Sequence, residues 1–139
     1  MDKLKLLKPK VKKLALALQK KAQAEGINLI FTCGFRSIAE QNQLYARGRT
    51  VPGKIVTIAR GGDSLHNYGV AFDICPVIGG KAIWNDLKLF NRIGKIGQEL
   101  GLEWGGAWSG FVDRPHFQYT AGYFLRDFKQ GKIDWKKFS

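Results

Sequence analysis

The run "VAFDIC" at residues 70–75 constrains the fold most strongly, because it places a carboxylate inside an otherwise apolar, strand-like segment. Successive side chains of a strand point to opposite faces, so Ala71 and Asp73 share one face while Phe72 and Ile74 share the other. An acidic side chain is costly to bury without a partner. The small side chain of Ala71 leaves room beside the carboxylate, and we expect an ion to bind there.

Helical periodicity near the start of the chain predicts an element that covers this sheet. Pro9 suits the first turn of such a helix and Gly26 suits its end. A basic amphipathic helix can also lie on a membrane, but a small domain needs helices to pack on its sheet, so we favour core packing. Apolar residues recur at steps of three and four, with lysines between them, at Leu4, Leu7, Val11, Leu14 and Leu18.

The rest of the chain alternates short β-rich runs with helical ones. Its length of 139 residues suffices for one core and is too short for two ordinary domains. We therefore predict a single small α+β domain over residues 1–139, with a mainly antiparallel sheet flanked by helices. The glycine-rich segment 48–64 is typical of a binding or gating loop. Residues 27–34, 102–104 and 116–119 have the pattern of strands. Helices are predicted to begin at a capping box at Ser37–Glu40, at an N-cap at Asn85 and near residue 123.

The formal charge of +12 and the pI near 9.9 indicate a polyanionic partner such as nucleic acid, anionic lipid or a wall polymer. Lysines cluster near both ends instead of interleaving with aromatic side chains, so we expect no nucleic acid. The first apolar run, "LALAL", is too short for a signal peptide or a bilayer span, and we expect no stable membrane insertion. We interpret Cys33 and Cys75 as reduced core residues.

Both histidines of the chain lie at turn-to-strand junctions, each near an aspartate. Catalytic zinc sites take three N, O or S ligands and leave a fourth position open. His66, Asp73 and His116 form such a candidate set. Asp113 is then the candidate general base, aimed at the same point by the turn at Pro115. Each residue taken alone is more often a surface or core residue, but the joint arrangement favours a metal.

The segment "SLHNYGVAFD" resembles the SxHxxGxAxD signature of the zinc D,D-peptidase and L-alanyl-D-glutamate peptidase family. This family includes D-alanyl-D-alanine carboxypeptidases and dipeptidases and several bacteriophage endolysins. The segments "TCGFRS…EQNQLYARGR" and "EWGGAWSGFVDRPHFQ" resemble its upstream arginine segment and its second metal segment. The resemblance covers residues 7–119 and implies a peptidase that holds Zn²⁺ in an open cleft.

The resemblance also implies a role for each matching residue. It implies that His66, Asp73 and His116 bind zinc. Asp113 matches the catalytic acid/base of the family. Arg36 matches the arginine that contacts the substrate and the oxyanion, a role that suits a fixed guanidinium. Without the resemblance, Arg36 would be interpreted as a surface arginine beside a helix N-cap.

Three further positions leave alternatives open. Ser64 matches the signature serine, which contacts substrate or supports the metal site, and it is equally compatible with a plain turn serine. Gln41 fits the family's "EQ" pattern as a substrate contact, or it is a helix-surface glutamine. Relatives often carry glutamate where this chain has Gln118, which leaves the hydrogen bonding around the second histidine open.

The motif "DRPHF" resembles the endolysin-like branch of the family, whereas the carboxypeptidase and dipeptidase branches commonly have glutamate as the base. The resemblance therefore implies a zinc-dependent peptidoglycan hydrolase that cleaves the L-alanyl-D-glutamate bond in cell-wall lysis. The alternatives are a D-alanyl-D-alanine carboxypeptidase and a non-catalytic basic wall-binding module. We expect a monomer that is made in the host cytoplasm without a signal peptide and reaches the wall with the help of a separate membrane-permeabilising protein.

Overall fold

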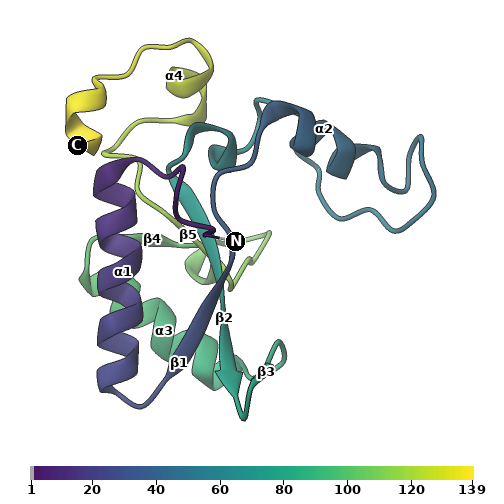
Figure 1. Cartoon of the computed structure of the whole chain (residues 1–139). Coiled ribbons are helices and arrows are strands. Elements are labelled where there is room, and N and C mark those ends of the chain that lie inside the picture. Colours follow the sequence, from purple (N-terminus) through teal and green to yellow (C-terminus); the bar gives the residue numbers. More distant parts are fainter. Residues whose placement is uncertain (1) are drawn as a thin grey trace.

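The computed structural model describes residues 2–139, and its helices and strands lie around one antiparallel sheet (Figure 1). The strands follow the order β1-β2-β5-β4, with the short β3 pairing with the far end of β2. This arrangement confirms the predicted α+β fold with helices flanking an antiparallel sheet. In chain order the elements are α1 (Pro9–Ala24), β1 (Asn28–Cys33), α2 (Ile38–Ala46), the 3₁₀ helix η1 (Leu65–Tyr68), β2 (Ala71–Ile78), β3 (Lys81–Ala82), α3 (Leu87–Glu99), β4 (Glu103–Trp104), η2 (Gly105–Ala107), β5 (His116–Gln118), α4 (Leu125–Lys129) and η3 (Trp135–Phe138).

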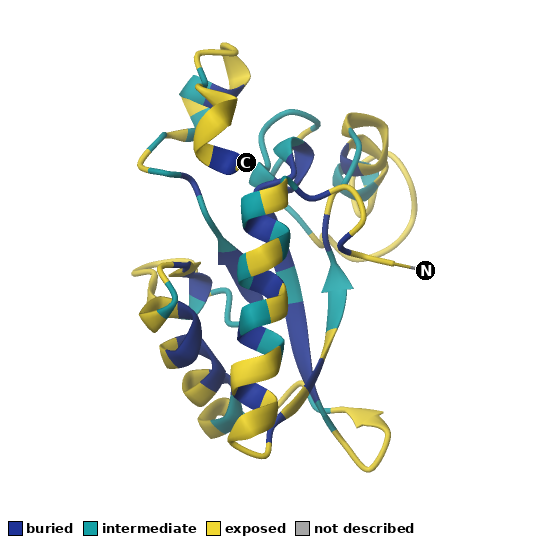
Figure 2. Cartoon of the chain, turned by 60° about the vertical axis from the view of Figure 1, so that its left-hand side comes forward, coloured by how far each residue is buried: buried dark blue, intermediate teal, exposed yellow. Residues whose placement is uncertain are grey.

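Helices α1 and α3 cover one face of the sheet (Figures 1 and 2). As the alternation of β2 predicts, Phe72 and Ile74 point into the core between the sheet and these helices, and both side chains are fully buried. Phe117 of β5 stacks on Phe72, with the two ring centroids 5.7 Å apart. The opposite face of β2 is thereby left for Asp73.

Helix α1 begins at Pro9, which occupies its first turn as predicted. Leu4 and Leu7 lie in the turns before the helix instead of on it, but both side chains are buried. The apolar side of α1 faces the core, and Figure 2 shows its buried and exposed residues alternating along the helix. Core packing is therefore confirmed as the use of this segment.

Helix α3 has Asp86 as its N-cap, so the prediction of Asn85 was wrong by one residue. The carboxylate of Asp86 accepts a hydrogen bond of 3.1 Å from the backbone N–H of Leu89, which satisfies one of the free donors of the first turn. Gly97 lets the helix approach the sheet closely, because an added Cβ there would overlap the buried ring of Phe117.

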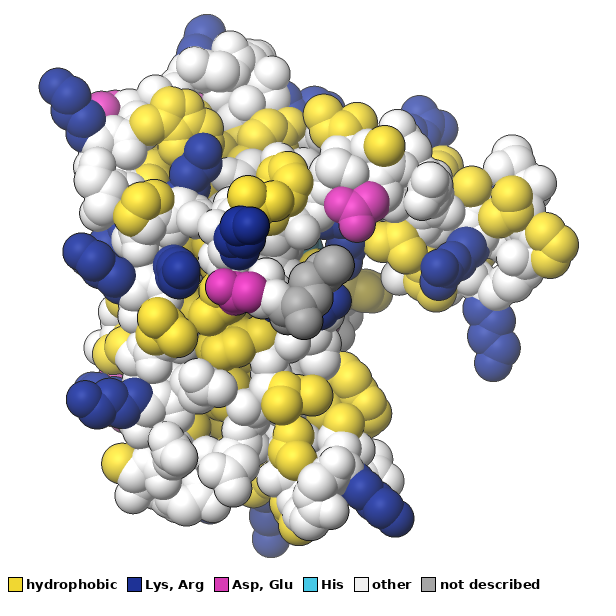
Figure 3. Space-filling view, viewed as in Figure 1, with side chains coloured by type: hydrophobic (Ala, Val, Ile, Leu, Met, Phe, Trp, Pro, Cys, Tyr) yellow, Lys and Arg dark blue, Asp and Glu magenta, His cyan; other side chains and the backbone are white. Residues whose placement is uncertain are grey.

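Residues 47–62, which we call the arm, extend together with α2 away from the sheet (Figure 1). The arm follows α2, which begins with the predicted capping box between Ser37 and Glu40. It has no carboxylate in its sequence, and Figure 3 shows basic side chains spread over both the arm and the body of the molecule. Among residues 2–139, no helix is both long and apolar enough to cross a membrane.

Candidate active site

The register of the sheet brings three potential ligand residues into one row. Cys33 of β1 pairs with Asp73 of β2, and Asp73 pairs with His116 of β5. An irregularity between Phe31 and Cys33 shifts the register of β1, as a β-bulge does, and this shift is what sets Cys33 opposite Asp73. The sheet thus presents a thiol, a carboxylate and an imidazole side by side on the face that the helices leave open.

His66 reaches the same point from η1, the short helix that follows the arm. Ser64 is the N-cap of η1, and its hydroxyl accepts a 3.3 Å hydrogen bond from the backbone N–H of His66. His66 is 4% exposed, and its Nδ1 lies 2.8 Å from the carbonyl oxygen of Gly34. A carbonyl can only accept, so Nδ1 carries the hydrogen, and Nε2 of the neutral ring is left with a lone pair.

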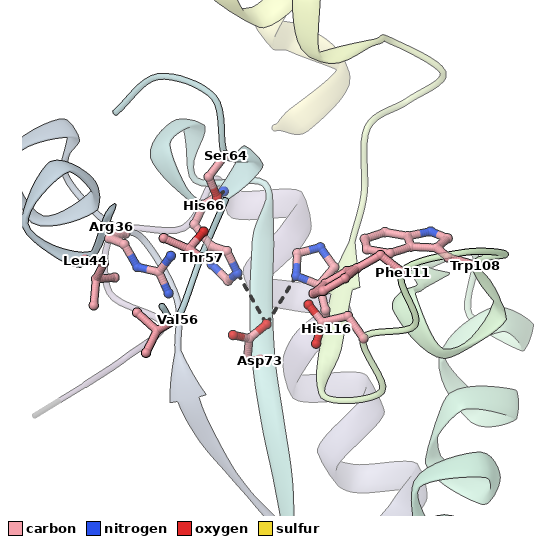
Figure 4. A pocket seen from close by; sticks show the side chains of 11 residues that line it. Arg36, Leu44, Val56, Thr57, Ser64, His66, Asp73, Trp108, Phe111 and His116 are labelled. Atoms are coloured by element: carbon pink, nitrogen blue, oxygen red, sulfur yellow. Dashed lines mark hydrogen bonds and ion pairs between the residues drawn. The ribbon is translucent and has the colours of Figure 1, made fainter. Parts of the chain in front are cut away.

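Nε2 of His66 and Nδ1 of His116 both face the same carboxylate oxygen. The distances to Oδ1 of Asp73 are 3.3 Å and 3.2 Å, respectively (Figure 4). Ligand atoms that share a tetrahedral zinc at about 2.0–2.1 Å lie about 3.3 Å from one another. The spacing of the three side chains therefore fits a divalent metal between them.

Gln118 and Glu103 determine which nitrogen of His116 is free. Oε1 of Gln118 lies 2.8 Å from Nε2 of His116, and Nε2 of Gln118 donates a 2.6 Å hydrogen bond to Glu103. A carboxylate can only accept, so the amide of Gln118 must turn its oxygen toward the ring. The ring therefore carries its hydrogen on Nε2, and its Nδ1 lone pair faces Asp73. Gln118 thus fills the hydrogen-bonding position around the second histidine that the sequence left open.

This donor set is incomplete without a cation. Two nitrogen lone pairs and a carboxylate oxygen converge, which is repulsive unless a proton or a metal lies between them. Burial disfavours the charged form of His66, but the hydrogen bond and charge of Asp73 outweigh burial and raise the pKa of His66 to about 10. Burial likewise opposes ionisation of Asp73, but the hydrogen bonds from His116 and His66 hold the pKa of its carboxyl well below the usual range.

Asp113 lies on the loop that leads into β5. Its backbone N–H donates a 3.0 Å hydrogen bond to the carbonyl of Gly105, and its carbonyl accepts one of 3.2 Å from the N–H of His116. Gly105 is required at this close approach, because an added Cβ would overlap the backbone of Asp113. Burial is the main cause that raises the pKa of the Asp113 carboxyl above its usual value.

The open face of the sheet forms the floor of a cleft of about 340 Å³. Val56 and Thr57 of the arm line one side of the cleft, and the loop with Trp108 and Phe111 lines the other (Figure 4). The cleft therefore joins a polar floor to apolar walls, as a peptide site does. Its lining consists of Arg36, Leu44, Val56, Thr57, Ser64, His66, Asp73, Trp108, Phe111, Asp113 and His116.

Of the predicted site residues, the structure brings all but Gln41 into this lining. Arg36 points into the cleft, and its guanidinium donates hydrogen bonds to Oε1 of Gln41 at 2.8 Å and to Sγ of Cys33 at 3.1 Å. Gln41 is fully buried behind Arg36, so in this conformation it is neither a helix-surface residue nor exposed to substrate. Its predicted substrate contact stays a prediction.

Sequence reasoning missed Cys33, Asn67 and Glu103. Cys33 was expected in the core with Cys75, which is fully buried, but it is half-buried beside His66, with its Sγ 3.6 Å from Nδ1 of that ring. Cys33, His66 and Asp73 offer ligand atoms within 4.8 Å of one another. The signal that could have located Cys33 is its place three residues before Arg36, at the end of the strand next to the site.

Comparisons with known proteins identify the family of this chain. A family model described as D-alanyl-D-alanine carboxypeptidase, of peptidase family M15, matches residues 57–119, which contain all three candidate ligands. The chain is 46% identical over 121 residues to the peptidoglycan L-alanyl-D-glutamate endopeptidase CwlK of Bacillus subtilis, an alignment that covers 81% of this chain and 72% of CwlK.

Two further proteins are similar to this chain, one from a phage and one with a solved structure. The L-alanyl-D-glutamate peptidase of Escherichia phage T5 is 30% identical, with 77% of this chain and 76% of that protein covered. The crystal structure of the L-Ala D-Glu endopeptidase ChiX of Serratia marcescens shares the fold, with a TM-score of 0.66 and 24% identity over 91% of this chain and 87% of ChiX. The chain therefore belongs to peptidase family M15, the family of zinc D,D-peptidases and L-alanyl-D-glutamate peptidases, and is a metallopeptidase.

Proposed function

We propose that this protein is a zinc-dependent peptidoglycan hydrolase that cleaves the bond between L-alanine and D-glutamate in the stem peptide. The observation that carries the proposal is the convergence of His66, Asp73 and His116 on one point in a cleft that is also lined by Asp113 and Arg36. The 46% identity to an L-alanyl-D-glutamate endopeptidase supports the choice of bond.

His66, Asp73 and His116 would hold the zinc ion, through Nε2, a carboxylate oxygen and Nδ1, respectively. A zinc ion in such a site supplies Lewis-acid chemistry, because it polarises the scissile carbonyl and lowers the pKa of the attacking water. Three protein ligands leave room for water and substrate, as catalytic zinc sites require. The hydrogen bonds to Gly34 and Gln118 hold the two imidazoles in the tautomers that face the metal.

Asp113 is the proposed general base, which accepts a proton from the attacking water and passes it to the leaving amine. A base works best when its pKa approaches the working pH, and burial shifts the pKa of Asp113 upward in that direction. Within residues 2–139, the hydrogen bonds of Asp113 are made by its backbone, which leaves its carboxylate free to take up the proton. Its place in the lining of the cleft leaves it accessible to a bound peptide.

Arg36 is the proposed stabiliser of the oxyanion that forms when water attacks the peptide carbonyl. A guanidinium has five N–H donors, and contacts with Gln41 and Cys33 engage one each of its two terminal nitrogens. The remaining donors stay available to the developing negative charge. Ser64 lies in the same lining and is proposed to contact the substrate, in addition to capping η1.

We also propose that residues 1–139 act as one catalytic domain and as a monomer on the anionic wall polymer. The hydrophobic core runs as one cluster from Leu4 to Phe138, which supports a single unit. The charge of +12 favours retention on wall polymer. The likeness to a phage peptidase supports a lysin that acts on the cell wall after its release.

D-Alanyl-D-alanine carboxypeptidase activity is the second candidate, because the matching family model carries that description. Mass spectrometry of purified peptidoglycan fragments, incubated with the zinc-loaded protein, tests both. A new amine on D-glutamate, absent in a chelator-treated control, is expected from the proposed endopeptidase. Release of terminal D-alanine alone would establish the second candidate, and unchanged fragments would contradict both.

A further inference from the structure

Gln41 joins Arg36 to the arm. Its Oε1 accepts the 2.8 Å hydrogen bond from Arg36, while its Nε2 donates a 2.9 Å hydrogen bond to the carbonyl of Ala59 and lies 3.5 Å from the hydroxyl of Thr57. A guanidinium can only donate and a carbonyl can only accept, so both ends of the amide are fixed by their partners. Thr57 itself lines the cleft.

Asn67 joins the backbone of Arg36 to the end of the arm, as Gln41 joins the side chain of Arg36 to Ala59. Its Nδ2 donates a 2.9 Å hydrogen bond to the carbonyl of Arg36, and its Oδ1 accepts hydrogen bonds from the backbone N–H groups of Gly62 at 3.0 Å and Ser64 at 3.3 Å. The backbone N–H of Arg36 in turn donates to the carbonyl of His66 at 3.0 Å. His66 and Asn67, which follow the arm, therefore bond to the backbone N–H and to the backbone carbonyl of Arg36, respectively.

Both amides are buried, so water cannot easily replace the hydrogen bonds that they make. Gln41 is 0% exposed and Asn67 is 8% exposed. A buried amide that lost its partners would cost free energy, so each amide holds its partners in one arrangement. The guanidinium of Arg36 is thus fixed from behind by Gln41, and its backbone is fixed to the His66 segment by Asn67.

We propose that Gln41 and Asn67 are positioning residues that set the place of the Arg36 guanidinium relative to the proposed metal ligands. They also link Arg36 to the arm, which lines one side of the cleft. This inference rests on the proposed function of Arg36. Neither amide touches the reacting atoms. Their contribution to catalysis passes through Arg36, where a misplacement of about 1 Å can lower the rate by about a hundredfold.

The first test compares Gln41→Met, Gln41→Glu and the control Gln43→Met on a soluble stem-peptide fragment of peptidoglycan. Gln43 is exposed on the same helix, so its replacement controls for the methionine itself. Methionine keeps the length of the side chain and removes both bonds, and we expect kcat to fall about ten- to a hundredfold with unchanged zinc affinity. Glutamate keeps the acceptor for Arg36 but loses the donor to Ala59, so it should keep a higher kcat than methionine.

Hydrogen–deuterium exchange gives a second readout that does not depend on cleavage. Both replacements of Gln41 should speed amide exchange in residues 57–62, because both release Ala59, whereas Gln43→Met should not. Asn67→Asp, which keeps the acceptor for Gly62 but loses the donor to Arg36, provides an independent variant if a Gln41 replacement folds poorly. Unchanged exchange and unchanged kcat in the folded variants would overturn the proposal.

A double-mutant cycle separates this inference from the proposed function. If Gln41 acts through Arg36, Gln41→Met should lower kcat in the wild-type background and have little further effect in Arg36→Ala. Equal losses in both backgrounds would overturn the positioning role. If Arg36→Ala alone leaves kcat unchanged, the proposed role of Arg36 fails, and the exchange data alone report on the tie between Gln41 and the arm.

Discussion

Replacing Gln118 with leucine should weaken zinc binding without removing a ligand. The change keeps the approximate volume of the side chain but deletes the oxygen that accepts the 2.8 Å hydrogen bond from Nε2 of His116. Without that acceptor, the hydrogen of the ring is no longer held on Nε2. The tautomer with hydrogen on Nδ1, the nitrogen that faces Asp73, then becomes accessible and cannot bind a metal there.

The expected magnitude follows from the burial of His116. Loss of a hydrogen-bond partner behind a metal-binding histidine typically costs about 10- to 100-fold in metal affinity, or about 1.4–2.7 kcal/mol. His116 is 7% exposed, and an unsatisfied buried N–H costs about 1–3 kcal/mol. The two figures agree, and we expect the upper half of the range.

The assay is a competition titration of zinc against a chromophoric chelator at fixed pH, with circular dichroism to confirm the fold. Gln43→Leu, on the exposed side of α2, is the control and should bind zinc like the wild type. A double variant that exchanges the two residues, Gln118→Glu with Glu103→Gln, should bind zinc like the wild type. Its carboxylate at position 118 would accept from the ring of His116, and its amide at position 103 would donate to that carboxylate. An unchanged zinc affinity in a folded Gln118→Leu variant would refute this account of the tautomer.

Three further predictions concern the base, the metal-free site and the core. Asp113→Asn should lower stem-peptide cleavage by about 10²- to 10⁴-fold, measured by mass spectrometry, with zinc content unchanged. In the metal-free protein, pairing with Asp73 raises the pKa of His66 from 6.5 to about 10, so the stabilisation that it contributes is complete below pH 6.5 and is lost as the pH rises through about 10. The thermal midpoint should therefore fall between these pH values, and a midpoint that does not change with pH would contradict the pairing of His66 with Asp73. Gly97→Ala should lower the free energy of unfolding by about 1–3 kcal/mol in denaturant titrations, because its methyl group overlaps Phe117, whereas Asn91→Ala on the exposed side of α3 should not.

Much of the fold could be predicted because the local patterns and the tertiary structure agree. The alternation of "VAFDIC" placed Phe72 and Ile74 in the core and Asp73 on the open face, as observed. The capping box at Ser37–Glu40 opens α2 as predicted. The cap of α3 was misplaced by one residue, since asparagine and aspartate are both good N-caps and the sequence offers them side by side.

The parts of the site that escaped prediction depend on register, which no local pattern specifies. The irregularity in β1 sets Cys33 beside Asp73, so a thiol that was expected in the core lies next to the candidate ligands. The pairing of Glu103 with Gln118 across β4 and β5 orients an amide that the sequence alone could not orient. Gln41 is buried, and its amide bonds to Ala59 of the arm, a contact between residues distant in the sequence that no local pattern specifies.

The register also explains how one short sheet supports a charged site. Asp73 lies on the central strand β2, with β1 on one side and β5 on the other, so its carboxylate is flanked by side chains from both neighbours. The next pair on the same face of the sheet, two residues toward the start of β2, sets the small Ala71 opposite Gln118, whose amide orients His116. A large residue in place of Ala71 would occupy the space beside that amide. The alanine in the signature therefore suits the proposed metal site, because it lets the hydrogen-bonding partner of a proposed ligand share its face of the sheet.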